Sequence, residues 1–325
     1  MKKKVLLIRL DKIGDLICTL PADQIIDPNQ YDVIWALQKG MGTISDLGTP
    51  KRTYFELDKS DPEKSAAKLR ELLKQIKPDI AISFQAPWWV NFELFKARVP
   101  TRAGVKSQWH SFLFLNRAIR QKRSLAQKHE LEYNLELVQK AFKISTKSEN
   151  LFFQIPMPKD VSALSKYQLL AKKYIVVHPG MTGSALNWPQ AQYIKYILEQ
   201  AAAGKKIAIT GTASDEPYLT EIKEKLSNHP DVTWLQSKLN LNELVQILAQ
   251  AEWVVAPSTG IAHIAASLGQ KVHAIYSPVR VHHPRRWGAR GPQVRIHLPP
   301  VICPGTHSCL GPACPAYYCM EMIRI

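Results

Sequence analysis

The first candidate for chemistry in this chain of 325 residues is a carboxylate close to the N-terminus. Residues 5–8 are apolar, as in a buried strand, and the run Arg9-Leu10-Asp11-Lys12-Ile13-Gly14-Asp15 follows directly. Gly14 lets the backbone turn sharply. Asp15 is then expected at the carboxyl edge of a sheet, where α/β domains place a general base. An N-cap of the next helix is the alternative role for Asp15.

A second group of residues suits a phosphate-bearing ligand. Thr259 and Gly260 follow an apolar strand and open a helix expected at 261–268. The exposed N–H groups and the positive dipole end of a helix bind phosphate. Ser258 and Thr259 add hydroxyl donors, and His263 lies one turn into the helix. The structural alternative is a strand, a cap and a helix with a buried histidine.

Two further loops also follow expected strands. In the first, Thr182, Gly183 and Ser184 are placed to donate hydrogen bonds to a diphosphate or a sugar, with Asn187 just beyond. In the second, Glu216 is a candidate for binding a nucleotide ribose, because acidic residues in such loops do so in doubly wound folds.

The elements that must position these residues alternate between strands and helices. This alternation predicts parallel sheets covered by helices on both faces. Residues 155–173 break the pattern and are predicted to be the linker region between two domains. We expect helices at 62–76, 130–142, 189–203, 217–226, 241–249 and 261–268, and strands at 5–9, 33–37, 53–57, 79–84, 174–177, 206–210, 232–235, 253–256 and 272–276.

Four segments in this order resemble the heptosyltransferases of glycosyltransferase family 9, which add heptose to the inner core of lipopolysaccharide. These four segments are His178-Pro179-Gly180, Asn187-Trp188-Pro189, the segment 257–263 and Arg286-Trp287-Gly288. Residues 5–21 also share the resemblance. The resemblance implies the glycosyltransferase-B architecture, an α/β fold of two Rossmann-like domains facing a cleft. Residues 1–158 would bind the acceptor, and residues 159–325, with a Cys-rich tail, the nucleotide sugar.

The resemblance also implies an inverting transfer from a nucleotide-diphosphate donor, ADP-heptose or a related sugar, with Asp15 as the general base. No Asp-x-Asp motif is present, so we expect no metal and no cofactor besides the nucleotide-sugar co-substrate. Two positions depart from the family. Asn187 stands where a Lys or Arg is common, and Ser258 where many members carry an Asp that contacts the donor sugar.

Residues 94–128 contain nine Lys or Arg and no Asp or Glu, with aromatic residues interleaved. Such a window is a solvated basic surface, or a surface that meets anionic headgroups and inserts apolar side chains between them. By the resemblance it lies on the acceptor side and would engage the phosphates and acidic sugars of a lipid A–Kdo glycolipid and the anionic inner membrane. The candidate acceptor-binding residues are Arg98, Arg102, Lys106, Arg117, Arg120, Lys122 and Arg123.

Composition sets the remaining bounds. A formal net charge of +16 favours a polyanionic partner. The sequence lacks an apolar run long enough to span a membrane or to form a signal peptide, so we expect a cytoplasmic protein that associates peripherally with the inner membrane. The oligomeric state cannot be derived from the sequence.

Four cysteines crowd the last two dozen residues: Cys303, Cys309, Cys314 and Cys319. Their spacing lacks the paired C-x₂-C pattern of structural zinc sites. Structural thiols, a metal site and redox pairing all stay open.

Three other functions compete with transfer. The two departures, Asn187 and Ser258, also fit a non-catalytic relative that acts as a glycolipid- or partner-binding scaffold. The positive charge alone suggests nucleic-acid binding, but no helix-turn-helix, RNP or zinc-finger pattern supports it, and we expect no nucleic-acid partner. A nucleotide-sugar epimerase of the same architecture needs further acid–base groups that we do not find.

Overall fold

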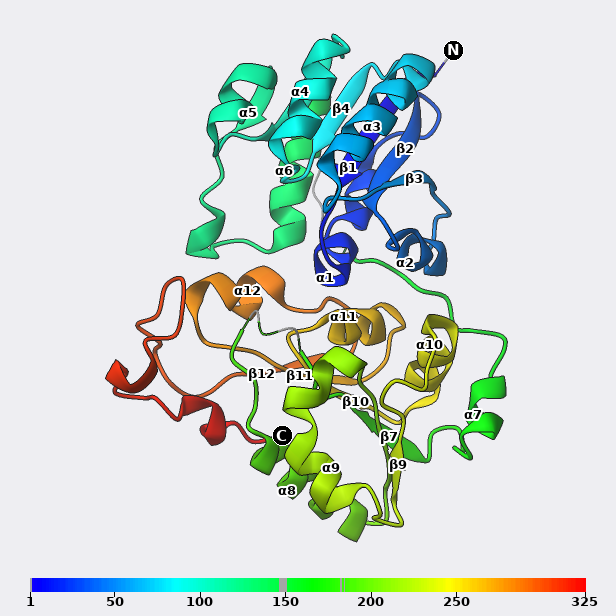
Figure 1. The fold of residues 1–325 in the computed structure, drawn as a ribbon, viewed down its shortest axis with the longest axis vertical. Helices are drawn as coiled ribbons and strands as arrows, with labels where there is room; N and C mark the ends of the chain where they lie inside the picture. Colours follow the sequence, from blue (N-terminus) through cyan, green and yellow to red (C-terminus); the bar gives the residue numbers. More distant parts are fainter. Residues whose placement is uncertain (1, 146–150, 182, 184) are drawn as a thin grey trace. The chain divides into compact units, whose positions relative to one another are not determined.

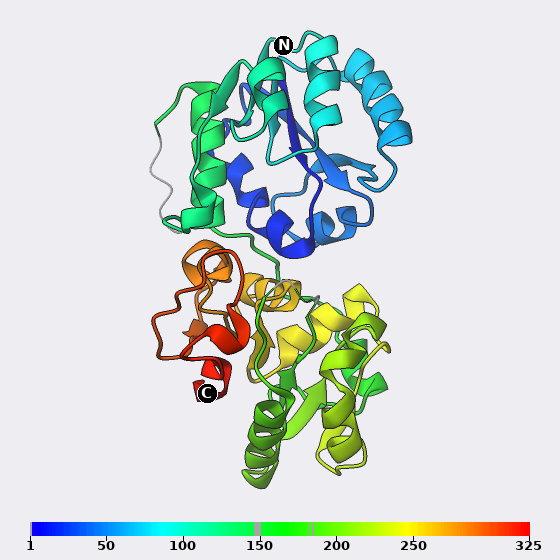
Figure 2. The same ribbon diagram turned by 60° about the vertical axis from the view of Figure 1, so that its left-hand side comes forward.

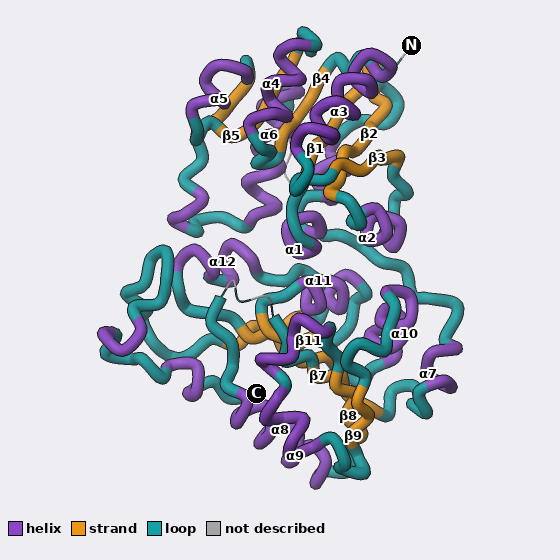
Figure 3. Tube along the Cα trace, in the orientation of Figure 1, coloured by secondary structure: helices purple, strands orange, loops and turns teal. Residues whose placement is uncertain are grey.

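A computed structural model of the chain describes residues 2–145, 151–181, 183 and 185–325. The chain divides into two compact units. Unit 1 comprises residues 1–123 and 128–153, and unit 2 comprises residues 124–127 and 154–325. Each unit contains one sheet of six parallel strands flanked by helices (Figures 1 and 3).

Unit 1 has the strand order β3-β2-β1-β4-β5-β6. In Figure 2 the helices α3 and α6 lie on opposite sides of these strands. The strands are β1 (Lys3–Arg9), β2 (Tyr31–Gln38), β3 (Thr53–Leu57), β4 (Ile80–Ser83), β5 (Thr101–Val105) and β6 (Arg117–Ile119). The helices are α1 (Ile13–Ile17), η1 (Leu20–Ile25), α2 (Gly42–Leu47), α3 (Pro62–Ile76), α4 (Trp88–Lys96), α5 (Trp109–Phe114), η2 (Arg123–Leu125) and α6 (Glu130–Phe142).

Unit 2 repeats this topology with the strand order β12-β11-β10-β7-β8-β9. The strands are β7 (Tyr174–Val177), β8 (Lys206–Ile209), β9 (Val232–Trp234), β10 (Val254–Pro257), β11 (Val272–Ile275) and β12 (Val294–His297). The helices are α7 (Ser162–Lys166), α8 (Gln190–Ala202), η3 (Ala213–Tyr218), α9 (Thr220–Leu226), α10 (Leu241–Gln250), α11 (Gly260–Ser267), η4 (Arg280–His282), α12 (Pro284–Trp287), η5 (Gly311–Ala313) and η6 (Cys319–Met322).

Each sheet has one point at which the strand order reverses. In unit 1 it lies between β1 and β4, and in unit 2 between β7 and β10. In open α/β sheets ligands bind outside the carboxyl ends of the strands at such a point. The two switch points therefore locate the candidate site residues of each unit.

Local signals explain the helices that the sequence predicted correctly. Helix α3 begins at Pro62, with the Asp61 side chain accepting a hydrogen bond from the Lys64 N–H, and it buries Leu69 and Leu73 against the sheet. Helix α10 has the predicted capping box of Asn240 and Glu243.

Three parts of the predicted element pattern were wrong or incomplete. The helix expected at 217–226 is α9 (Thr220–Leu226), and it is separated at Leu219 from η3, which contains Pro217. No element was predicted at α4, α5, β5, β6 or β12, which are short and carry mixed polar and apolar residues.

The third error concerns residues 155–173, which belong to the fold of unit 2 and are not a free linker. The Ile155 N–H donates to the Ser267 carbonyl (2.9 Å). In the same segment the Ala163 N–H donates to Gln246 Oε1 (2.9 Å). The prolines and lysines there mark irregular backbone, which the sequence pattern could not distinguish from a linker.

Candidate functional site

Asp15 lies in the first turn of α1, directly after β1 and at the switch point of unit 1 (Figure 1). Its Oδ1 accepts a hydrogen bond from Arg9 Nη2 at 2.6 Å. The side chain of Lys12, the N-cap, makes no cap bond, and Asp15 keeps a quarter of its side-chain surface exposed. The carboxylate is thus held at the carboxyl edge of the sheet with one oxygen tied to a guanidinium.

A fully buried arginine organises the charges around this carboxylate. Arg9 has no exposed side-chain surface, and three carboxylates surround it. Asp15 is one, Asp11 lies 3.0 Å from Nε, and Glu130 lies 3.5 Å from Nη1. Asp11 is also paired with Lys59 (2.8 Å). One cation is therefore shared among several anions.

This arrangement leaves Asp15 more basic than an ordinary aspartate. Burial raises its pKa, Arg9 opposes the shift, and the negative charges of Asp11 and Glu130 raise it further. A general base works best when its pKa lies closer to the working pH than that of a free carboxylate. The residue can therefore accept a proton.

Glu130 links this cluster to helix α6. It is the first residue of α6, is fully buried and forms an ion pair with Arg123. One turn on, Asn134 donates to the Cys18 carbonyl (3.3 Å) and to Thr19 Oγ1 (3.0 Å). Helix α6 thus holds the segment that follows Asp15 in place.

Strand register separates the seven candidate acceptor-binding cations. Because β5 and β6 run parallel to β1, the residues that follow them lie at the same edge of the sheet as Asp15. Lys106 directly follows β5, and Arg120 and Lys122 follow β6. These three share the edge of Asp15.

The other four cations are placed differently. Arg98 precedes β5 and lies toward the opposite, amino edge. Arg102 Nε donates to the Phe114 carbonyl (2.7 Å), and Arg117 Nη1 donates to the Ala141 carbonyl at the end of α6. Arg123 is buried. Because none of these four is an exposed cation at the edge of Asp15, they are not part of the acceptor surface proposed below.

In unit 2 the loop after β7 packs tightly against the loop after β8. A Cβ at Gly180 would come within 2.2 Å of Asp215 Cγ, so only glycine fits there. Asp215 in turn accepts from the Thr212 N–H (2.7 Å). Burial lowers the pKa of His178 to about 4, which makes it a neutral ring near pH 7, and its Nδ1 lies 3.0 Å from Thr210 Oγ1.

Asn187 is built into its own loop. Its Nδ2 donates to the Pro179 carbonyl (2.7 Å). Its Oδ1 accepts from the Trp188 N–H (2.8 Å) and from the Tyr193 hydroxyl (3.2 Å). The amide therefore shapes the loop. Of its neighbours, Gly183 has φ 71°, and Thr182 and Ser184 lie outside the described residues.

Helix α11 begins at the switch point of unit 2. Thr259 is its N-cap and Gly260 its first residue, and the eight-residue helix directs its first N–H groups beyond β10. Thr259 Oγ1 is buried and has no hydrogen-bond partner among the described residues. Ser258 is partly exposed, and His263 is buried on the helix. An anion placed at this helix start would meet N–H donors and a hydroxyl.

Glu216 lies in η3, at the carboxyl end of β8. Its Oε2 accepts from Gln236 Nε2 (2.6 Å), and its Oε1 lies 3.4 Å from Lys223 Nζ. The Gln236 hydrogen bond lowers the pKa of Glu216, so its carboxylate is ionised at neutral pH. It keeps lone pairs for a hydroxyl donor such as a ribose.

Three negative findings concern the described residues. The five cysteines are free thiols. No group of three or more His, Cys, Asp or Glu in the described ranges is arranged to hold a metal ion. The described helices also include none that is long and apolar enough to cross a bilayer.

Sequence reasoning missed the buried charge cluster. Arg9 and Glu130 are 121 residues apart, since 130 minus 9 is 121, and no pattern within one segment links them. The one available signal was an arginine at the end of an apolar strand, where a buried cation requires carboxylate partners.

Comparison with known proteins identifies the family. The family model for glycosyltransferase family 9 (heptosyltransferase) matches residues 66–312. A Haemophilus influenzae protein provisionally named a glycosyltransferase is 26% identical over 302 residues, covering 88% of this chain and 85% of that protein. Lipopolysaccharide heptosyltransferase 1 of Escherichia coli is 26% identical over 304 residues, covering 85% of this chain and 88% of that protein.

Among solved structures, E. coli ADP-heptose lipopolysaccharide heptosyltransferase II superimposes with a TM-score of 0.75 at 19% identity. The match covers 99% of this chain and 97% of that one, and it shows the shared glycosyltransferase-B fold. The chain is therefore a glycosyltransferase. It belongs to family 9, the heptosyltransferase family.

Proposed function

We propose that this protein is an inverting, metal-independent glycosyltransferase that moves a heptose, or a related sugar, from a nucleotide diphosphate to the inner core of lipopolysaccharide. The observation that carries the proposal is Asp15, a partly exposed carboxylate held by Arg9 at the switch point of unit 1. Family membership and the lipopolysaccharide heptosyltransferases among the relatives support the substrate class. The donor is ADP-heptose, as named for the E. coli structure.

In this mechanism Asp15 removes the proton from the acceptor hydroxyl as the oxygen attacks the anomeric carbon. Arg9 holds Oδ1, so Oδ2 is the oxygen that receives the proton. The new C–O bond forms on the face opposite the diphosphate, and the bond from the anomeric carbon to the phosphate oxygen breaks, which inverts the configuration. General-base assistance of this kind contributes about a hundredfold or more to the rate.

Unit 2 stabilises the departing diphosphate without a metal. The N–H groups at the start of α11, with the hydroxyls of Ser258 and Thr259, face the developing negative charge. Gly183 supplies a further donor from the loop after β7. Thr182 and Ser184, which lie outside the described residues, stay predicted donors on the sequence alone. Glu216 binds the ribose. His263, one turn into α11, contacts a phosphate oxygen.

The acceptor is a phosphorylated glycolipid of the lipid A–Kdo type. Lys106, Arg120 and Lys122, which share the sheet edge of Asp15, bind its phosphates and acidic sugars. The protein then works in the cytoplasm and associates peripherally with the anionic inner membrane, where such a glycolipid is anchored.

The test is sugar transfer measured by mass spectrometry. The purified protein is incubated with ADP-heptose, ADP-glucose, UDP-sugars or GDP-sugars, and with Kdo–lipid A acceptors that carry no heptose or one heptose. The proposal predicts one added heptose from ADP-heptose. Transfer of a different sugar would revise the donor, whereas turnover with none of them, together with no nucleotide binding, contradicts the proposal.

One observation favours a second candidate, a non-catalytic scaffold. The Asn187 amide is engaged within its own loop, and both Asn187 and Ser258 are neutral at positions where the resemblance implies charge. A protein that binds the glycolipid but transfers nothing is the outcome that this alternative predicts. Any turnover that depends on the enzyme excludes it.

A further inference from the structure

One face of unit 1 combines exposed aromatic side chains with cations. Helices α4 and α5 present Trp109 at 63% exposure, Phe112 at 56% and Leu113 at 64%. Trp88 and Phe95 are also exposed. Large apolar side chains gathered on one surface are unusual unless that surface meets an apolar environment.

The aromatic side chains form one continuous cluster across the two helices. The ring of Phe114 lies 5.3 Å from Phe92, 5.5 Å from Phe95 and 6.1 Å from Trp109, between ring centroids. Phe92 extends the cluster to Trp88 at 6.1 Å. The exposed rings therefore pack against less exposed rings of the same cluster. We call this surface the α4–α5 face, and its aromatic residues are in mutual contact.

Cations surround the same rings. Lys96 lies over the ring of Phe92 (5.3 Å), and Lys106 lies over that of Phe112 (4.7 Å). Residues 94–128 hold no Asp or Glu, so nothing in this stretch of sequence neutralises them. The acidic residue just before it, Glu93, is buried and bonded to Arg70.

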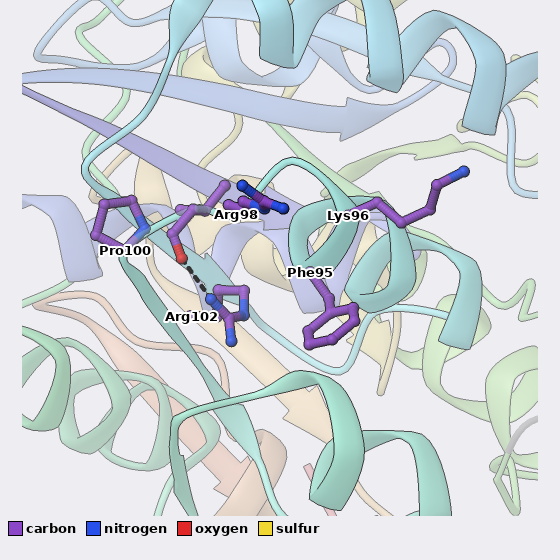
Figure 4. A pocket seen from close by; sticks show the side chains of 6 residues that line it. Phe95, Lys96, Arg98, Pro100 and Arg102 are labelled. Atoms are coloured by element: carbon purple, nitrogen blue, oxygen red, sulfur yellow. Dashed lines mark hydrogen bonds between the residues drawn. The ribbon is translucent and has the colours of Figure 1, made fainter.

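An open cavity of about 430 Å³ lies at the turn between α4 and β5 (Figure 4). Lys96, Arg98 and Arg102 line it together with Phe95. Arg102 uses Nε and Nη1 for backbone carbonyls, which fixes the guanidinium beside the cavity. Figure 4 shows the Lys96 side chain directed away from Arg102, so the cations at the hollow are Arg98 and Arg102, and two guanidinium groups suit a phosphate group.

We propose that the α4–α5 face docks on an anionic lipid bilayer, with its aromatic side chains in the headgroup region and the cavity at Arg98 and Arg102 around a lipid phosphate. Tryptophan and phenylalanine favour the membrane interface, and anionic lipids attract clustered Lys and Arg. This inference deepens the proposed function, which places the acceptor in a membrane. Only the cavity separates lipid contact from acceptor contact, because Arg98 lies toward the sheet edge opposite Asp15, whereas Lys106 belongs both to the face and to the proposed acceptor site.

Vesicle flotation tests the proposal without any transfer assay. Vesicles of phosphatidylcholine, alone or mixed with phosphatidylglycerol, carry no glycolipid acceptor. We expect binding to the mixed vesicles and little to phosphatidylcholine alone, with binding falling as salt rises. Equal binding to both, or binding only after a Kdo–lipid A acceptor is added, overturns the proposal.

Matched variants locate the surface. Replacing Trp109 and Phe112 with Ser should weaken binding at least about tenfold, because each ring loses apolar burial. Lys96→Ser and Arg98→Ser should each weaken it about fivefold at low salt. The control is Leu170→Ser with Ile302→Ser, which removes two exposed apolar side chains from unit 2 (73% and 99% exposed) and should leave binding unchanged.

A docking partner other than lipid gives different outcomes. If the Trp109→Ser/Phe112→Ser variant changes the oligomeric state in light scattering and not vesicle binding, the face joins two copies of the chain and the proposal is wrong. Transfer to a water-soluble acceptor fragment should survive in the Lys96→Ser variant, which leaves the contact between Phe112 and Lys106 intact. The flotation result stands even if the wild type transfers no sugar, so the two proposals fail separately.

Discussion

Two regions of unit 1 use cations in opposite ways. Around Arg9 the cations are buried and paired: Arg9 contacts Asp11, Asp15 and Glu130, and the buried Arg123 also pairs with Glu130. On the α4–α5 face the cations are exposed beside aromatic rings, in a stretch without acidic residues. A buried charge must be paired to be tolerated, whereas an unpaired exposed charge is free to meet an anion. The same residue types are therefore buried and paired in one region and exposed beside aromatic rings in the other.

The largest expected effect comes from removing one partner of the buried cluster. Glu130→Gln leaves Arg9 and Arg123 with less negative charge in a site without solvent. We expect a loss of about 3 kcal/mol in the free energy of unfolding, measured by urea denaturation. The control is Glu71→Gln, whose pair with Lys74 is exposed and should contribute less than about 1 kcal/mol. An equal loss in the free energy of unfolding for the two variants would show that the buried pair contributes no more to stability than an exposed pair.

A smaller effect is expected at the packed loops of unit 2. Gly180→Ala places a Cβ against Asp215, and the loop must shift at a cost of about 1–3 kcal/mol. We expect weaker ADP binding in calorimetry, with the acceptor KM unchanged. Wild-type ADP affinity in this variant would show that the loop after β7 does not shape the donor site.

The exposed cations at the Asp15 edge should affect acceptor binding alone. Replacing Lys106, Arg120 and Lys122 with Ser should raise the acceptor KM about tenfold or more at low salt, with kcat and the donor KM little changed. Replacing Lys159, Lys225 and Lys238 of unit 2 with Ser removes the same net charge and should leave the acceptor KM unchanged. If both triple variants behave alike, only overall charge matters.

The pH dependence of kcat/KM tests whether the buried charge cluster controls the pKa of Asp15. The base must be ionised, so kcat/KM falls as the pH drops through the pKa of Asp15. Because burial and the neighbouring carboxylates raise that pKa, the fall should begin at a higher pH than for a free aspartate. Glu130→Gln removes a negative charge from the cluster and should move the acidic limb to lower pH. An unchanged limb in this variant would uncouple Glu130 from the base.

The sequence predicted those parts of the fold that carry local signals. Helices α3 and α6 begin and end at the predicted residues, because Asp61-Pro62 and the capping box of His129 and Glu132 mark their starts. It also placed Asp15 after β1 and Thr259-Gly260 at the start of α11, since both follow apolar strands.

The remaining features depend on contacts between distant segments. Arg123 was grouped with exposed cations because its partner Glu130, which makes it a buried residue, is only recognisable once α6 packs. The prediction for residues 94–128 rests on their charge, and charge does not indicate β5, α5 and β6 or the two sheet edges that these elements define. Parallel pairing is non-local, so the edge on which a cation lies cannot be derived from composition.

The central claim is that Asp15 is the general base, and its most direct test is the transfer rate of Asp15→Asn. The variant keeps the shape of the side chain and a hydrogen-bond acceptor for Arg9. We predict a variant that still unfolds cooperatively, with normal ADP binding and a transfer rate lowered at least about a hundredfold. A folded variant that transfers sugar at nearly the wild-type rate would contradict the claim and leave Asp15 as a structural residue of α1.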